Sequence, residues 1–141
     1  MIRSMKTCLL LLLVAAMLSG CAGLERRDRL SKLEKSLEGY AAALRWARYS
    51  DAYDYLRARD GSKPELRLDG FDNYRVAEME IIRSDLNPDE TEANTYVLIR
   101  YYKDTSGTIQ ELKQVQDWWY QDESGRWFLA GDLPYPADMK K

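Results

Sequence analysis

The chain has 141 residues, of which 45% are hydrophobic and 31% charged, with 21 basic and 23 acidic side chains and a net charge of −2. One domain is expected at this length, and the absence of a basic excess argues against binding to nucleic acid. Histidine is absent and cysteine occurs only at Cys8 and Cys21, so we expect no zinc, copper or haem cofactor and no Ser–His or Cys–His nucleophile pair.

An apolar run from Cys8 to Leu18 follows two basic residues near the start of the chain. Eleven uncharged residues are too few to span a bilayer, which takes about 20, so residues 1–20 are predicted to be a secretory signal peptide. The run ends in Leu-Ser-Gly-Cys at residues 18–21, which resembles the lipobox of bacterial lipoproteins. This resemblance implies cleavage before Cys21 and a lipid on its sulfur. The alternative is an ordinary signal peptide cut nearby, with Cys21 incidental.

Ala22 follows that cysteine. In enterobacterial lipoproteins an aspartate at this position resembles an inner-membrane retention signal, so Ala22 implies transfer to the outer membrane, where the lipid would hold the chain at the periplasmic face. Two or more acyl chains would give stable anchoring. The chain from Cys21 onward keeps 19 basic and 23 acidic residues, a net charge of −4, and it contains no second thiol with which to form a disulfide.

The apolar residues between Leu24 and Tyr49 recur at alternating spacings of three and four, which predicts an amphipathic helix. Residues 21–39 would form its membrane-proximal part, and Gly39 is expected to mark a bend before the part that joins the core. The apolar stripe is predicted to pack on the chain's own sheet, with a coiled-coil dimer as the alternative. Ser50 is expected to cap a second helix over residues 51–59.

Beyond residue 66 the hydrophobic period changes to that of strands. After a short extended piece at residues 66–68, strands are predicted at residues 74–86, 94–103, 108–121 and 126–131. Short polar turns join them, so we expect an antiparallel meander. Helices followed by strands indicate an α+β domain, with N-terminal helices packed on one face of a curved antiparallel sheet of about four strands.

The strand at residues 94–103 carries apolar side chains on both of its faces. Such a strand is central in its sheet and needs a cover on each face. The helices supply one cover. We expect the second cover to be another copy of the chain, a partner protein, or the curl of the sheet itself.

Two stretches carry a further resemblance, ALRWARYSDAYDYLRARDG at residues 43–61 and DWWYQDESGRWFLAGDLP at residues 117–134. A helix pair ahead of a meander that closes in an aromatic hairpin resembles small bacterial lipoproteins with a cystatin-like or nuclear-transport-factor-like domain. The resemblance implies one such domain at residues 40–134, followed by a polar tail at residues 135–141. Enzymes of this fold group use a pocket histidine and aspartate, and because the chain has no histidine, the resemblance implies no activity.

All sixteen aromatic residues lie between Tyr40 and Tyr135. Aromatics on strands would form a cup that stacks on sugar rings or an extended peptide, because they offer rigid apolar area with a polar group. The alternative is that they fill the core between helices and sheet. The candidate ligand or partner surface comprises Tyr96, Tyr102, Trp118, Tyr120 and Trp127.

Acidic residues are the remaining chemical groups of interest. Acid–base hydrolysis needs two carboxylates that converge. Glu78 and Glu80, which are two residues apart on one strand, and Asp117 across the sheet are the candidates. Their alternation with apolar residues instead points them toward water, and Asp54 is expected to lie on a solvated helix surface.

We therefore expect a lipid-anchored envelope module that binds and does not catalyse. It would dock an envelope protein or form a homodimer through a face of its sheet. Two alternatives remain open: a carrier that holds a small apolar or glycan ligand in the aromatic cup, and a carboxylate-based hydrolase.

Overall fold

The structure is a computed structural model that describes residues 2–136, with the side chains of residues 21–69 and 71–136. Met1 and residues 137–141 of the predicted tail lie outside the described residues, as do the side chains of the predicted signal peptide. The elements in chain order are α1 Ile2–Arg45, α2 Tyr49–Tyr53, the 3₁₀ helix η1 Leu68–Phe71, β1 Tyr74–Leu86, β2 Glu92–Lys103, β3 Ile109–Gln121 and β4 Arg126–Ala130.

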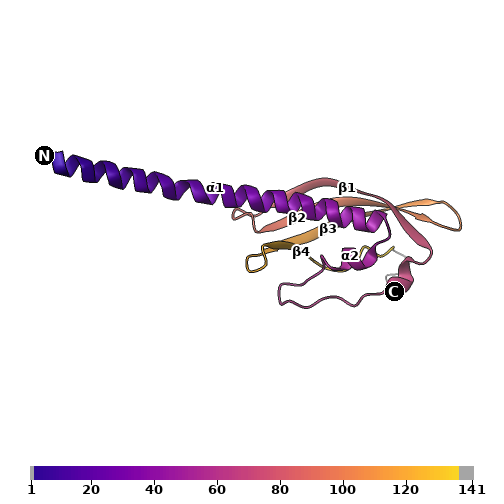
Figure 1. Ribbon diagram of the computed structural model, residues 1–141. Coiled ribbons are helices and arrows are strands. Elements are labelled where there is room, and N and C mark those ends of the chain that lie inside the picture. The colour runs from indigo at the N-terminus through magenta and orange to yellow at the C-terminus, as the bar shows by residue number, and fades with distance from the viewer. Residues whose placement is uncertain (1, 137–141) are drawn as a thin grey trace.

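The four strands form one antiparallel sheet in the order β1-β2-β3-β4, and α1 lies along one face of it (Figure 1). This is the α+β arrangement that the sequence predicts, with consecutive strands joined by short turns. Each strand lies within about two residues of its predicted position. The meander is specified well because alternation of apolar and polar side chains fixes which face of each strand packs against the helix.

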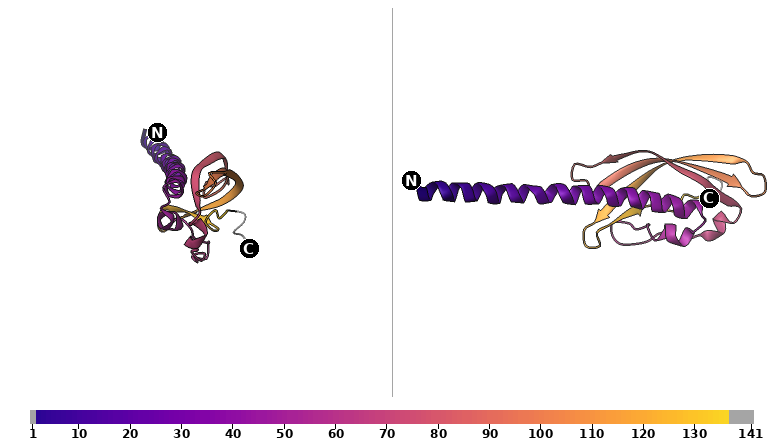
Figure 2. Two further views of the ribbon diagram at one scale, coloured as in Figure 1. Left: turned by 90° about the vertical axis from the view of Figure 1, so that its right-hand side faces the viewer. Right: turned by 45° about the horizontal axis from the view of Figure 1, so that its top comes forward.

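Helix α1 is one uninterrupted helix that passes through Cys21 and continues to Arg45. Figure 2 shows it straight along its length, so the predicted bend at Gly39 is wrong. The glycine instead leaves room for a neighbour, because a Cβ at Gly39 would overlap the hydroxyl of Tyr55. The Tyr55 ring packs edge-on against the rings of Tyr40 and Trp118, with centroids 5.9 and 6.2 Å apart.

Helix α1 ends at Arg45, four residues before the predicted end at Tyr49. Ala47 adopts a left-handed conformation with φ of 54°. The amide of Arg48 donates to the carbonyl of Ala43 at 2.8 Å, and the amide of Ala47 donates to Leu44 at 3.1 Å. This is the Schellman pattern, which normally places glycine where Ala47 stands.

The second helix is shorter than predicted, and Ser50 lies inside it instead of capping it. The predicted helix over residues 51–59 is cut short because the backbone after Tyr53 pairs with β4. The amide of Arg57 donates to the carbonyl of Leu129 at 3.0 Å, and the amide of Leu129 donates to Tyr55 at 2.8 Å. The extended piece expected at residues 66–68 ends one residue early: Arg67 is extended, with φ of −114° and ψ of 89°, and a 3₁₀ turn begins at Leu68.

The core lies between α1 and the face of the sheet that α1 covers. It contains the helix stripe and large aromatic side chains, and its bulkiest fully buried members include Tyr40, Leu44, Phe71, Tyr101, Trp118 and Trp127. Gln116 is buried among them, and its side-chain oxygen accepts a hydrogen bond from the Trp118 indole at 3.0 Å. Within the part of the chain whose side chains are described, no helix is long and apolar enough to cross a membrane.

Candidate binding surfaces

The five aromatic residues of the candidate cup lie on two different faces of the sheet. Trp118 and Trp127 are buried beneath α1, and Tyr120 is half-buried beside them. The Trp127 indole donates to the carbonyl of Arg29 at 2.8 Å, which ties β4 to the helix. Tyr96 and Tyr102 point away from the helix, because alternate residues of β2 face opposite sides. The five residues therefore do not line a single cup, and the two tryptophans fill the core.

The candidate acids belong to two separate ion-pair clusters on the surface. Arg100 contacts Glu78 at 2.6 Å, Glu80 at 3.1 Å and Glu111 at 3.1 Å. The hydrogen bond that Arg100 donates to Glu111, followed by the one that it donates to Glu78, raises the pKa of the Arg100 guanidinium. All three carboxylates are exposed, so they share one cation at the surface and do not face a common cavity.

Asp117 belongs to the second cluster. Its two oxygens accept hydrogen bonds from Arg59 at 2.7 and 2.9 Å, and Glu92 contacts the same guanidinium at 3.1 Å. The bond to Asp117 is the main reason that the pKa of Arg59 is raised. Asp54 is exposed and lies 3.4 Å from Lys63. No group of three metal-ligating side chains converges in the described residues.

An apolar groove crosses the sheet face that α1 does not cover. It has a volume of about 400 Å³, and its apolar walls are Ile82, Tyr96, Leu98 and Val115. Ile82 is 58% exposed and Val115 is 55% exposed. The segment after α2 covers the end of this face at β3 and β4, where Arg57 lies over the Phe128 ring and Arg59 pairs with Asp117. The groove itself stays open, so the second apolar face predicted for β2 is present and is open to solvent there.

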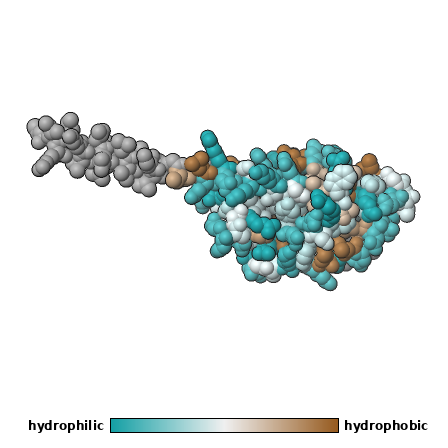
Figure 3. Space-filling model, in the orientation of Figure 1, coloured by the Kyte–Doolittle hydropathy of each residue, from teal (hydrophilic) through white to brown (hydrophobic). Residues whose placement is uncertain are grey.

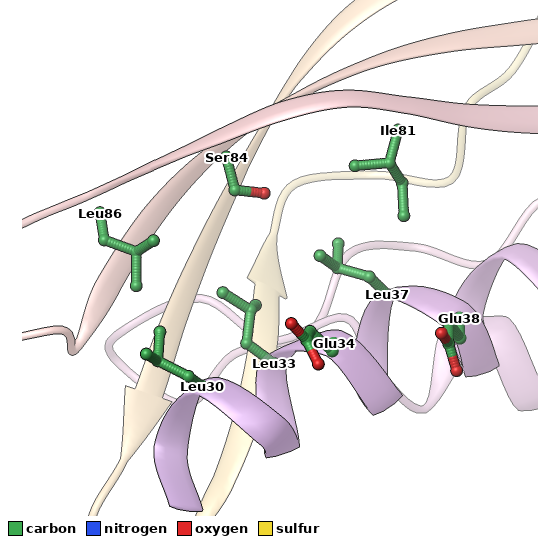
Figure 4. Close-up of a pocket in the computed structure, with 8 residues that line it drawn as sticks. All are labelled: Leu30, Leu33, Glu34, Leu37, Glu38, Ile81, Ser84 and Leu86. Atoms are coloured by element: carbon green, nitrogen blue, oxygen red, sulfur yellow. The ribbon is translucent and has the colours of Figure 1, made fainter. Parts of the chain in front are cut away.

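A second groove runs between α1 and β1 and has a volume of about 320 Å³. Figure 4 shows leucines of α1 opposite Ile81 and Leu86 of β1, with Ser84 between these two. Glu34 and Glu38 of the helix also line the groove, and Figure 4 shows Glu34 between Leu33 and Leu37. The groove is thus apolar at its floor and acidic along one edge. Its helix leucines are Leu30, Leu33 and Leu37.

The two grooves lie on opposite faces of the sheet, and consecutive residues of the edge strand β1 line them. Ile81 pairs with Val97 and Arg83 pairs with Tyr96, so Ile82 is the extra residue of a β-bulge. Ile81 lines the groove beside α1, and Ile82 lines the groove on the open sheet face. We call these residues and the walls of both grooves the β1-edge surface. Most of the view in Figure 3 is hydrophilic, with separate hydrophobic patches.

Sequence reasoning predicted the β2 part of the β1-edge surface but missed the part on β1 and α1, although one signal for it was present. Strand β1 alternates apolar and acidic residues from Ala77 to Ile81, and Ile82 breaks that alternation. Two consecutive isoleucines cannot both face the core of a regular strand. Such a pair indicates either a bulge or an exposed apolar side chain, and the structure has both.

Cys21 and Ala22 are exposed on α1, and the Cys21 thiol is free. They lie well before Leu30, where α1 begins to line the groove. The side chains of Arg26 and Arg29 donate to the carbonyls of Pro88 and Asp89, at 3.5 and 3.4 Å. These bonds tie α1 to the turn between β1 and β2.

No protein-family model matches the sequence, and the search of curated proteins finds no match. Among solved structures, the chain resembles a protein of Xanthomonas campestris pv. campestris that is provisionally assigned as a polyketide cyclase. The identity is 13% and the TM-score 0.43, over 77% of this chain and 93% of that chain. A similarity at this level carries no argument about function.

Proposed function

We propose that the chain is a lipid-anchored envelope lipoprotein that acts as a non-catalytic binding module and docks another protein on its β1-edge surface. The observation that carries the proposal is that two open apolar grooves flank the edge strand β1, one lined by Ile81 and the other by Ile82. Apolar grooves rimmed by polar residues are a common form of protein interaction site.

The surroundings of this surface also favour a protein partner. Charged groups frame the apolar walls: the Arg83 guanidinium lies 4.1 Å from the centre of the Tyr96 ring, and the Arg100 cluster lies further along the same strands. An apolar centre with a polar rim is the usual anatomy of a protein–protein interface.

Contact at this surface would be made through side chains. Strand β1 is an edge strand, but bulges interrupt it between Val76 and Glu78 and between Ile81 and Arg83. Bulges and charged side chains hinder backbone pairing along a sheet edge. A partner would therefore seat apolar side chains in the grooves instead of adding a strand to the sheet.

The residues named for the two alternative functions do not come together in the structure. A carrier would use an aromatic cup, but Trp118 and Trp127 are packed in the core. A hydrolase would use two converging acids, but Glu78 and Asp117 lie in different ion-pair clusters. Lipid anchoring is supported by the lipobox at residues 18–21 and by the exposure of Cys21 on α1.

Site-specific photocrosslinking tests the proposed surface. A photoreactive phenylalanine analogue would replace Ile82 or Val115 in the full chain expressed in its native membranes. The matched control is the same analogue at Ser62, which is exposed on the loop after α2.

We expect a discrete crosslinked species from Ile82 and Val115 and none from Ser62. A product of twice the chain's mass would identify a second copy as the occupant, whereas another discrete mass would identify an envelope protein. Crosslinks that are absent at both groove positions, or equally strong at Ser62, would refute the proposal.

A further inference from the structure

The groove between α1 and β1 continues past Ile81 toward the C-terminal end of the helix. A second hollow, with a volume of about 340 Å³, shares Glu38 and Ile81 with it and reaches Arg45 and Trp46. We call the two hollows together the α1–β1 groove. From Leu30 to Arg45 the helix beside it rises about 22 Å, or about four turns. A groove of this length suits an elongated occupant better than a small ligand.

The walls of the α1–β1 groove are mainly apolar. Figure 4 shows three leucines of α1 opposite Ile81 and Leu86 of β1. Further along, Ala41 and Ala42 line the groove, and Trp46, just past the end of the helix, is 70% exposed. The distance between packed helices depends on the side chains at their contact, so two alanines leave room for a second helix beside α1. Tryptophan is enriched among the residues that dominate binding energy.

The charges along the middle of α1 differ between its two sides. Lys32 and Lys35 line the side next to β4, whereas Glu34 and Glu38 line the α1–β1 groove. Lys32 is paired with Asp28 at 2.7 Å. Both glutamates are exposed, and neither has an ion pair within the described residues. Their charges are therefore available to a partner.

Two further charged residues line the far end of the groove. Glu78 is bound by Arg100 at 2.6 Å, and the Arg45 guanidinium lies 5.9 Å from the centre of the Trp46 ring. The unpaired charge in the groove is thus negative beside the leucines and positive only at the Arg45 end.

A basic amphipathic helix complements this groove in shape and in charge. Such helices dock in apolar grooves through apolar anchors spaced three or four residues apart. We propose that the α1–β1 groove binds an amphipathic helix of a partner protein, with lysine or arginine side chains of that helix against Glu34 and Glu38. The inference rests on the proposed function and names the kind of segment that its partner presents.

A second copy of the chain is the other candidate occupant. Two chains anchored at Cys21 in one bilayer would have parallel α1 helices, and a two-fold axis would place each groove against the same groove of the other copy. Glu34 would then face Glu34 and Glu38 would face Glu38, which like-charge repulsion disfavours. A different protein that brings cations carries no such penalty.

The test uses the full chain in nanodiscs of phosphatidylcholine. The probe is a synthetic helical peptide of about 16 residues, which matches the length of the groove, with leucines along one face and lysines beside them. Methyl NMR of isoleucine follows binding, because Ile81 lines this groove, Ile82 lines the open sheet face, and Ile109 is 63% exposed outside both. Empty nanodiscs measure the peptide that is lost to lipid.

Two matched comparisons isolate the role of charge. The variant Glu34→Gln/Glu38→Gln removes both unpaired acids of the groove and keeps their side-chain size. The control Glu65→Gln/Glu123→Gln removes two exposed acids elsewhere, so the net charge is matched. A second peptide, in which glutamate replaces each lysine, tests the charge from the side of the partner.

We expect the lysine peptide to shift the Ile81 methyl signal saturably and to leave that of Ile109 unchanged. Its dissociation constant should rise about fivefold in the groove variant, the usual weight of two exposed ion pairs, and should be unchanged in the control. The glutamate peptide should bind the wild type more weakly than the lysine peptide does.

The absence of a saturable Ile81 shift, equal weakening in the control, or equal binding of the two peptides would overturn the proposal. An Ile81 shift that grows with the number of chains per nanodisc, without peptide, would assign the groove to a second copy and would also overturn it. Crosslinking from Ile82 and Val115 tests the proposed function separately. Discrete crosslinks without an Ile81 shift would refute the helical partner and leave the binding module standing.

Discussion

Replacing Gly39 with alanine separates two opposing effects on the stability of α1. Glycine inside a helix costs about 0.5–1 kcal/mol relative to alanine, so helix propensity alone predicts stabilisation. The structure predicts the opposite, because the new Cβ would overlap the Tyr55 hydroxyl. Tyr55 cannot turn aside easily, since its ring packs against the rings of Tyr40 and Trp118.

Overpacking of a tightly packed site costs about 1–3 kcal/mol, which exceeds the gain in helix propensity. Gly39→Ala should therefore lower the free energy of unfolding by roughly 1 kcal/mol, because the gain in helix propensity offsets only part of the overpacking cost. Equilibrium urea unfolding of the full chain in detergent, followed by tryptophan fluorescence, measures the change.

The double variant Gly39→Ala/Tyr55→Phe identifies the cause. Without the hydroxyl the nearest ring atom lies 3.4 Å from the new Cβ, so most of the loss should be recovered, with a coupling energy of about 1 kcal/mol between the two sites. Stabilisation by Gly39→Ala alone, or additive effects of the two substitutions, would refute the packing argument.

Four further predictions concern the helix end, the buried polar groups and the anchor. Ala47→Gly should raise the thermal midpoint, gaining about 1 kcal/mol, because alanine is strained in the left-handed region; a lower midpoint would contradict the observed φ of 54°. Gln116→Leu should cost about 1–3 kcal/mol in urea unfolding, because it leaves the buried Trp118 indole without its acceptor; an unchanged midpoint would count against that bond. Burial raises the pKa of the Tyr40 hydroxyl above its usual value. As the pH rises past about 10, Tyr40 therefore ionises first in the unfolded state, and the free energy of unfolding falls. Urea midpoints between pH 9 and 11 (about one unit either side of the unfolded pKa) should fall less steeply in Tyr40→Phe, and equal slopes would exclude this tyrosine as a source. Cys21→Ala should release the protein from membranes into the soluble fraction with unchanged circular dichroism, and firm attachment of the variant would refute the anchor.

The strands and their pairing could be predicted because each has a clear two-residue period ending at a turn. The helical segments were predicted less well, for reasons of tertiary contact. Nothing local to residues 54–59 stops a helix, and the second helix ends early because Leu56 forms a β-bridge with Leu129, far along the chain. Gly39 likewise looks like a weak point of α1 until Tyr55 is seen against it.

The candidate surfaces show the same limit. The period of β3 and β4 indicates that Trp118 and Trp127 alternate with outward residues, but it does not say which face the helix covers. That choice is made by the packing of α1, which puts the tryptophans inside and leaves Tyr96 with the open groove. The bulge at Ile82 depends on the register between β1 and β2, and a single strand does not reveal its register.

The continuity of α1 has a mechanical consequence. The helix that carries Cys21 is also the helix whose leucines pack into the core, so no hinge separates a lipid at that cysteine from the sheet. A disordered linker would let the domain sample many distances from the membrane and contact partners at any of them. A rigid helix would instead hold the edge of β1 at one distance from the bilayer and allow mainly rotation about the helix axis. The distance of a partner's binding surface from the membrane, as well as its affinity, would then decide whether the two proteins interact.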